Sequence, residues 1–115
     1  MQFPTIQFKA TNIELEPTWQ TLVEQKFTQL EKFLGEAGDV TCDVEFEKVT
    51  MQQSGNVHKV EANLYRDGKL FRAEATSDSF EKAIDEVRDE LDKELRRANK
   101  KDETLLKRGG RAIKI

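Results

Sequence analysis

Basic side chains near the carboxyl end are the residues of this sequence with the clearest capacity for chemistry. Lys93, Arg97 and Lys100 are spaced i, i+4 and i+7, so they share one face of a helix that carries them. Cations at this spacing can contact successive phosphates of a nucleic-acid backbone. A helix with acidic residues first and basic residues last is also stabilised through its dipole. Periodicity alone therefore leaves phosphate binding and helix stabilisation equally open.

The charge of the chain is divided unevenly along its length. The net charge is −3, but residues 1–92 hold 10 Lys and Arg against 19 Asp and Glu, whereas residues 93–115 hold 9 against 3. An acidic domain with a basic end is typical of a protein that faces a polyanion with that end. The cations of the basic end are Lys93, Arg96, Arg97, Lys100, Lys101, Lys107, Arg108, Arg111 and Lys114. The last four flank Gly109-Gly110, and we interpret this stretch as an exposed tail that favours phosphate binding.

Residue types that support catalysis or metal binding are few. Cys42 is the one cysteine, which excludes an intramolecular disulfide and a multi-cysteine metal site, and its place in an alternating run predicts a small core residue. His58 is the one histidine, and we interpret it as an ordinary surface residue. Asp85, Glu86, Asp89 and Glu90 indicate a solvated helix face. We therefore expect no enzyme activity, no cofactor and no metal.

The sequence lacks the marks of membrane insertion or export. No stretch approaches the roughly 18 apolar residues that a membrane span needs. The first nine residues lack the basic start and apolar run of a signal peptide. A single cysteine fits a reducing compartment. These observations predict a cytoplasmic protein without a membrane partner.

Alternating and helical apolar patterns predict an α+β domain. The order is β-α-β-β-β-α, which indicates a mainly antiparallel four-stranded sheet with two helices packed on one face. Asp67-Gly68 joins two alternating runs and predicts a tight hairpin turn. The domain should cover residues 1–100, followed by a basic tail over 101–115. The expected strands cover residues 5–10, 40–49, 57–66 and 69–76, and the expected helices begin at residues 17 and 80 and end near 34 and 99.

The aromatic residues do not form an obvious stacking platform. Phenylalanines at 27, 33, 46, 71 and 80 fall on predicted core faces, and Tyr65 is the one aromatic placed outward on a strand. Tyr65 could stack on a base, but a lone tyrosine on a solvated sheet face more often packs against a cross-strand neighbour. The pattern thus favours recognition of shape and backbone over recognition of bases.

Three strings in this order resemble a known family. They are Lys-Phe-Thr-Gln-Leu-Glu-Lys-Phe at 26–33, Val-Glu-Phe-Glu-Lys at 44–48 and Ser-Asp-Ser-Phe-Glu-Lys-Ala-Ile-Asp at 77–85. The chain resembles the bacterial ribosome-hibernation proteins, which include hibernation-promoting factor, ribosome-associated inhibitor A and the sigma-factor modulation proteins. The resemblance extends from residue 3 to about residue 100. It suggests a divergent member of the short form, because no room remains after residue 115 for the second domain of the long form.

The resemblance implies a fold similar to double-stranded-RNA-binding domains and a role in translation. Family members bind the small ribosomal subunit, contact 16S rRNA in the channel for messenger and transfer RNA, and block translation under stress. Their contacts are mostly basic residues on both helices. Lys26, Lys32, Lys93 and Arg97 match these positions, whereas Gln29, Glu90 and Glu94 replace residues that are basic or neutral in the family.

The expected RNA-binding residues are therefore Lys26 and Lys32 together with the nine cations of the basic end. No DNA partner is expected. Two alternatives remain open at this point. One is a protein-interaction module whose acidic domain binds a basic partner, and the other is a protein of the same fold that binds a different structured RNA.

Overall fold

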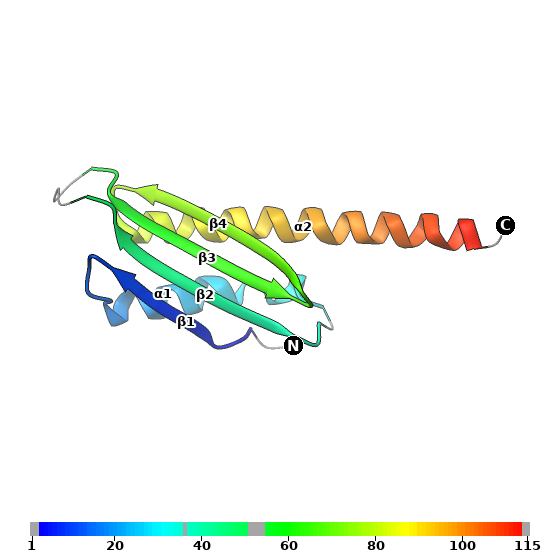
Figure 1. The fold of residues 1–115 in the computed structure, drawn as a ribbon, viewed down its shortest axis with the longest axis horizontal. Helices are drawn as coiled ribbons and strands as arrows, with labels where there is room; N and C mark the ends of the chain where they lie inside the picture. Colours follow the sequence, from blue (N-terminus) through cyan, green and yellow to red (C-terminus); the bar gives the residue numbers. More distant parts are fainter. Residues whose placement is uncertain (1–2, 36, 51–54, 114–115) are drawn as a thin grey trace.

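The computed structural model describes the backbone of residues 3–35, 37–50 and 55–113, and the side chains of these residues up to 101. Four strands and two long helices follow one another in the predicted order (Figure 1). The elements are β1 (Ile6–Thr11), α1 (Pro17–Thr28), a short 3-10 helix η1 (Glu31–Phe33), β2 (Val40–Lys48), β3 (His58–Arg66), β4 (Lys69–Ser77) and α2 (Phe80–Ile113).

The four strands form one mixed sheet in the order β1-β2-β3-β4. β1 pairs with β2 in parallel, because α1 carries the chain back across the sheet, and the two later pairs are antiparallel hairpins. Both helices lie on the same face of the sheet (Figure 1). The predicted α+β class and two-layer arrangement are confirmed.

The core lies between this inner sheet face and the two helices. Alternate strand residues and one stripe of each helix supply it, as the apolar periodicity predicts. The Trp19 ring of α1 lies 5.5 Å from Phe46 of β2 and 4.5 Å from Phe80 of α2. These aromatic contacts join both helices to the sheet, so α2 has a fixed place over β3 and β4.

The turn between β3 and β4 has the geometry that Asp67-Gly68 predicts. Asp67 and Gly68 have φ values of 50° and 84°, the positive values that a type I′ turn needs at both central positions. The Asp67 carboxylate accepts hydrogen bonds from the backbone N–H of Gly38 at 3.0 Å and of Asp39 at 2.9 Å. The hairpin end is thereby tied to the loop that enters β2.

The first helix ends earlier than the sequence predicts. α1 stops at Thr28, and the chain continues through hydrogen bonds between residues three apart, with the N–H of Leu30 bonded to the carbonyl of Phe27 at 2.9 Å. Leu30 and Leu34 are still buried. A three-residue spacing suits an α-helix and a 3-10 turn alike, so the apolar pattern could not separate them.

The second helix is longer than the sequence predicts. α2 does not end near Asn99 but continues to Ile113, beyond the end of the sheet (Figure 1). No residue between 99 and 108 is a glycine or proline, so helix propensity does not stop it there. The prediction that this helix ends near Asn99 was therefore wrong. Lys107, Arg108 and Arg111 stand in helical turns where the dipole also favours them, which removes one argument for phosphate binding.

Candidate nucleic-acid interface

The exposed face of α2 carries a stripe of cations between residues 93 and 101, the last turns whose side chains are described. Its inner side is buried, with Leu91 and Leu95 fully covered and Ala98 6% exposed. The outer side presents the exposed residues Lys93, Arg96, Arg97, Lys100 and Lys101. We call these five residues the α2 stripe. The predicted shared face is confirmed, because the core side of the helix fixes which side the cations take.

One flank of the α2 stripe meets η1. The guanidinium carbon of Arg96 lies 5.4 Å from the ring centre of Phe33, and the Lys32 Nζ lies 5.2 Å from the same ring. Arg96 also forms an ion pair with Asp92, with 2.6 Å between Nε and Oδ1. The fold thus brings two predicted RNA-binding residues, Lys32 and Arg96, to the same aromatic ring.

The other flank of the α2 stripe meets β4. An open groove of about 210 Å³ lies between them. Arg97 forms an ion pair with Glu94, with 3.4 Å between Nη1 and Oε1. The groove is lined by Lys69, Leu70 and Phe71 of β4 and by Glu94, Arg97, Ala98 and Lys101 of α2. Lys69 is a cation that sequence reasoning did not place near the basic end.

Lys26 of α1 lies apart from the α2 stripe. Its Nζ is 2.5 Å from Asp85 Oδ1 in the first half of α2. Arg96 is 11 residues further along that helix, which corresponds to about 16 Å of helical rise. Lys26 therefore joins the two helices, and its charge is largely balanced by Asp85. Asp85 is half exposed and pairs with Lys26, which the sequence did not predict, and Glu86, Asp89 and Glu90 are exposed as predicted.

Gln29, the residue that follows α1, also contacts α2. The Arg88 Nη1 donates a hydrogen bond to the Gln29 Oε1 at 2.9 Å. A cation thus lies beside position 29, although it comes from α2 and was not among the predicted residues. Residues 107, 108 and 111 of the basic end belong to the α2 backbone, and residue 114 lies outside the described residues.

The residues considered for catalysis have structural roles. Cys42 is buried as predicted, and burial, with a smaller effect from the Asp43 charge, raises the pKa of its thiol to about 12. His58 is half-buried rather than a surface residue. Its Nδ1 lies 3.2 Å from the carbonyl oxygen of Ser77, and its ring packs edge-on against Phe80 at 4.9 Å. Among the described residues, no three His, Cys, Asp or Glu side chains are grouped as a metal site would require.

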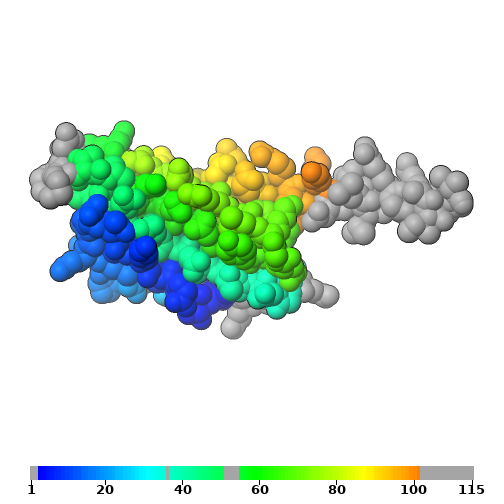
Figure 2. Space-filling model, viewed as in Figure 1, coloured from blue at the N-terminus to red at the C-terminus, as the bar shows by residue number. Residues whose placement is uncertain are grey.

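The outer face of the sheet has the opposite character to the α2 stripe. Cross-strand pairing places Glu45, Glu61 and Glu74 side by side in one row of β2, β3 and β4 (Figure 2 shows this face). Burial raises the pKa of Glu61, but hydrogen bonds from Arg72 and Asn63 and the charges of Arg72 and Lys59 outweigh this, so the net pKa is lowered. Glu61 therefore stays ionised at neutral pH.

A profile of one protein family matches this arrangement of elements. The family described as sigma 54 modulation protein / S30EA ribosomal protein matches residues 6–103. The chain belongs to this family. The match covers every strand, α1 and the α2 stripe. Of the curated protein sequences, none matches the chain.

Solved structures of low sequence identity share the fold. A ribosomal subunit interface protein from Coxiella burnetii is 21% identical with a TM-score of 0.68, and the match covers 82% of this chain and 96% of that one. The N-terminal domain of Protein Y from Thermus thermophilus is 20% identical, also with a TM-score of 0.68, and the match covers 82% of this chain and 98% of that one. The chain therefore spans nearly the whole of both folds.

No helix in the described part of this chain is long and apolar enough to cross a membrane.

Two cations at the interface were missed from the sequence. Lys69 follows the hairpin turn, but only the position of α2 over β4 brings it near Arg97, and no local pattern encodes that distance. Arg88 could have been found, because three- and four-residue steps place it on the flank of α2 beside the core stripe. Lys69 can be assigned to the interface only when the packing of the two layers is known.

Proposed function

We propose that this protein binds the small ribosomal subunit through 16S rRNA phosphates in the channel for messenger and transfer RNA, and thereby blocks translation. The observation that carries the proposal is the α2 stripe on a chain of the S30EA family. Five exposed cations on consecutive turns suit a row of backbone phosphates, which carry no sequence information. Recognition would then depend on the shape of the rRNA.

The part of the outer sheet face that carries the glutamate row does not suit such a partner. On the outer sheet face the row of glutamates would repel phosphates. Those glutamates are already paired within the domain, with 3.0 Å between Arg72 Nη2 and Glu61 Oε2 and 3.4 Å between Lys59 Nζ and Glu74 Oε2. A basic protein partner would have to displace these pairs, which disfavours the alternative of an acidic interaction module.

Co-sedimentation with purified ribosomal subunits tests the proposal. At low salt and with small subunits in excess, the protein should move with the small subunit through a sucrose gradient and be released as salt is raised. Lys93→Glu should weaken this binding, because it reverses a charge in the α2 stripe. Lys9→Glu, an equal charge change on the exposed face of β1, serves as the matched control. Protein that stays at the top of the gradient under these conditions would refute the proposal.

A further inference from the structure

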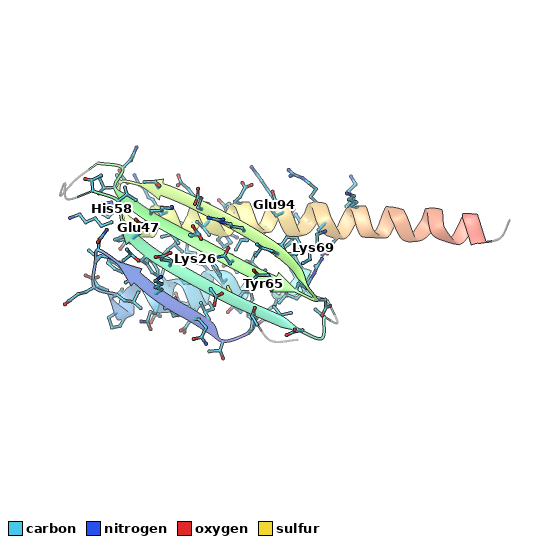
Figure 3. All side chains as sticks on the ribbon, in the orientation of Figure 1. Lys26, Glu47, His58, Tyr65, Lys69 and Glu94 are labelled. Atoms are coloured by element: carbon cyan, nitrogen blue, oxygen red, sulfur yellow. The ribbon has the colours of Figure 1, made fainter. Side chains whose placement is uncertain are left out.

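The groove between β4 and α2 has the composition of a phosphate site. Three of its lining residues are cations, Lys69, Arg97 and Lys101, and one is a carboxylate, Glu94. The cations come from two elements that are far apart in sequence, and Figure 3 shows Lys69 at the hairpin end beside α2. A phosphate between them would be contacted from two sides.

The charges in this groove are only partly neutralised within the domain. Glu94 pairs with Arg97, but within the described part of the chain neither Lys69 nor Lys101 is paired with a carboxylate. The Lys69 Nζ lies 5.5 Å from the ring centre of Phe71, and the guanidinium carbon of Arg66 lies 5.1 Å from it. The Phe71 ring therefore contacts two cations at the hairpin end, beside the groove.

Apolar surface adjoins these cations. Leu70 is 44% exposed and Tyr65, its cross-strand partner, is 42% exposed, and both lie on the outer sheet face at the hairpin end. With Val49 they are the exposed large hydrophobic residues of the described chain. Apolar and aromatic surface beside a cationic groove suits a nucleotide, whose sugar and base follow its phosphate. An isolated inorganic phosphate would use the groove alone.

We infer that the RNA surface continues from the α2 stripe around the hairpin end, with one rRNA phosphate held between Lys69, Arg97 and Lys101 and the adjoining nucleotide against Tyr65 and Leu70. This inference rests on the proposed function and extends it to a second element. It assigns a binding role to Lys69, which stands outside the helices.

Charge variants at position 69 test the inference in the full-length protein. Lys69→Glu should weaken binding to small subunits by on the order of tenfold at fixed salt, and Lys69→Ala should lower the slope of log affinity against log salt by about 1. Lys69→Arg should keep both quantities. Lys9→Glu, with the same charge change at the opposite edge of the sheet, should have the smaller effect.

The binding measurements distinguish the groove assignment from the proposed function. If the natural protein binds small subunits and Lys69→Glu binds no worse than Lys9→Glu, the groove assignment is overturned while the proposed function stands. If the natural protein does not bind, both are overturned. A photo-crosslinking group at position 70 should react with rRNA, and exclusive reaction with ribosomal protein would overturn the groove assignment.

Discussion

Several cations at the interface form ion pairs with carboxylates of the same domain, which partly neutralise them. Asp92 holds Arg96, Glu94 holds Arg97 and Asp85 holds Lys26, so several predicted RNA-binding residues are paired within the domain. Exposed pairs of this kind contribute little to stability. Replacing these ion pairs by contacts with phosphates should therefore require little free energy.

Glu94 is the residue at which this exchange can be measured. Glu94→Gln removes a carboxylate from the groove and frees Arg97, so binding to small subunits should become a few-fold tighter and more salt-dependent. Titration of labelled protein at several salt concentrations measures both effects. Glu14→Gln, an equal charge change in the exposed loop before α1, should leave affinity nearly unchanged. Weaker binding of Glu94→Gln would show that the carboxylate serves the complex.

Cys42 should be inert in the folded protein. Its buried thiol, with a pKa of about 12, is almost entirely protonated at pH 8, whereas an unfolded cysteine has a pKa near 8.5. Iodoacetamide should label the native chain very slowly and the urea-unfolded chain readily, as measured by mass spectrometry. Rapid labelling under native conditions would show that β2 opens or that the thiol is accessible.

At the scale of elements, a small hydrogen-bonded cluster of Arg66, Phe33 and Asn99 attaches α2 to the sheet. The Arg66 Nη1 donates to the carbonyl of Phe33 at 2.8 Å and to the Asn99 Oδ1 at 2.7 Å, and the Asn99 Nδ2 donates to the same carbonyl at 3.1 Å. Three elements, β3, η1 and α2, therefore meet at one carbonyl. The cluster positions the α2 stripe against both of its flanks.

Removal of Asn99 should loosen this junction. Asn99→Ala leaves Arg66 and the Phe33 carbonyl each without one hydrogen bond, so the free energy of unfolding should fall by about 1–3 kcal/mol. Urea unfolding followed by circular dichroism measures it. Lys93→Ala, an exposed substitution on the same helix, should change stability by less than about 0.5 kcal/mol. Equal effects of the two variants would refute a structural role for the cluster.

Sequence reasoning predicted the elements well where burial decides them and less well where it does not. The alternation of Val40, Cys42, Val44 and Phe46 predicts β2, because alternate residues must enter the core. The end of α2 was placed 14 residues too early, because the apolar stripe that marked the helix in the sequence ends at Ala98. The β4 flank of the interface depends on how two layers pack, which no local pattern contains.

Across the whole molecule, a row of carboxylates and a stripe of cations lie on different surfaces. The outer sheet face carries the glutamate row, and the α2 stripe lies on the helical layer, so the domain is electrostatically polar although its net charge is only −3. The resulting electric field directs a polyanion toward the α2 stripe. The extension of α2 past the sheet lengthens the helical layer that carries the α2 stripe, without adding to the described core.

Deletion of residues 102–115 should therefore separate binding from stability. The last buried residue of the described chain is Ala98, so the unfolding free energy should change by less than about 1 kcal/mol. Small-subunit binding should weaken and its salt slope should flatten by up to about 3, because Lys107, Arg108, Arg111 and Lys114 are lost. An unchanged slope would exclude contact between this segment and RNA.

Directed hydroxyl-radical probing of 16S rRNA tests the central claim most directly. Since Cys42 is buried, a single surface cysteine can carry the iron chelate, at Glu90→Cys on α2 or at Gln7→Cys on the exposed face of β1, the edge strand opposite β4. Both variants should first be shown to bind small subunits like the natural protein. We predict strong cleavage of rRNA lining the channel for messenger and transfer RNA from position 90, and weaker cleavage from position 7. Cleavage outside the channel, or stronger cleavage from position 7, would contradict the proposed function.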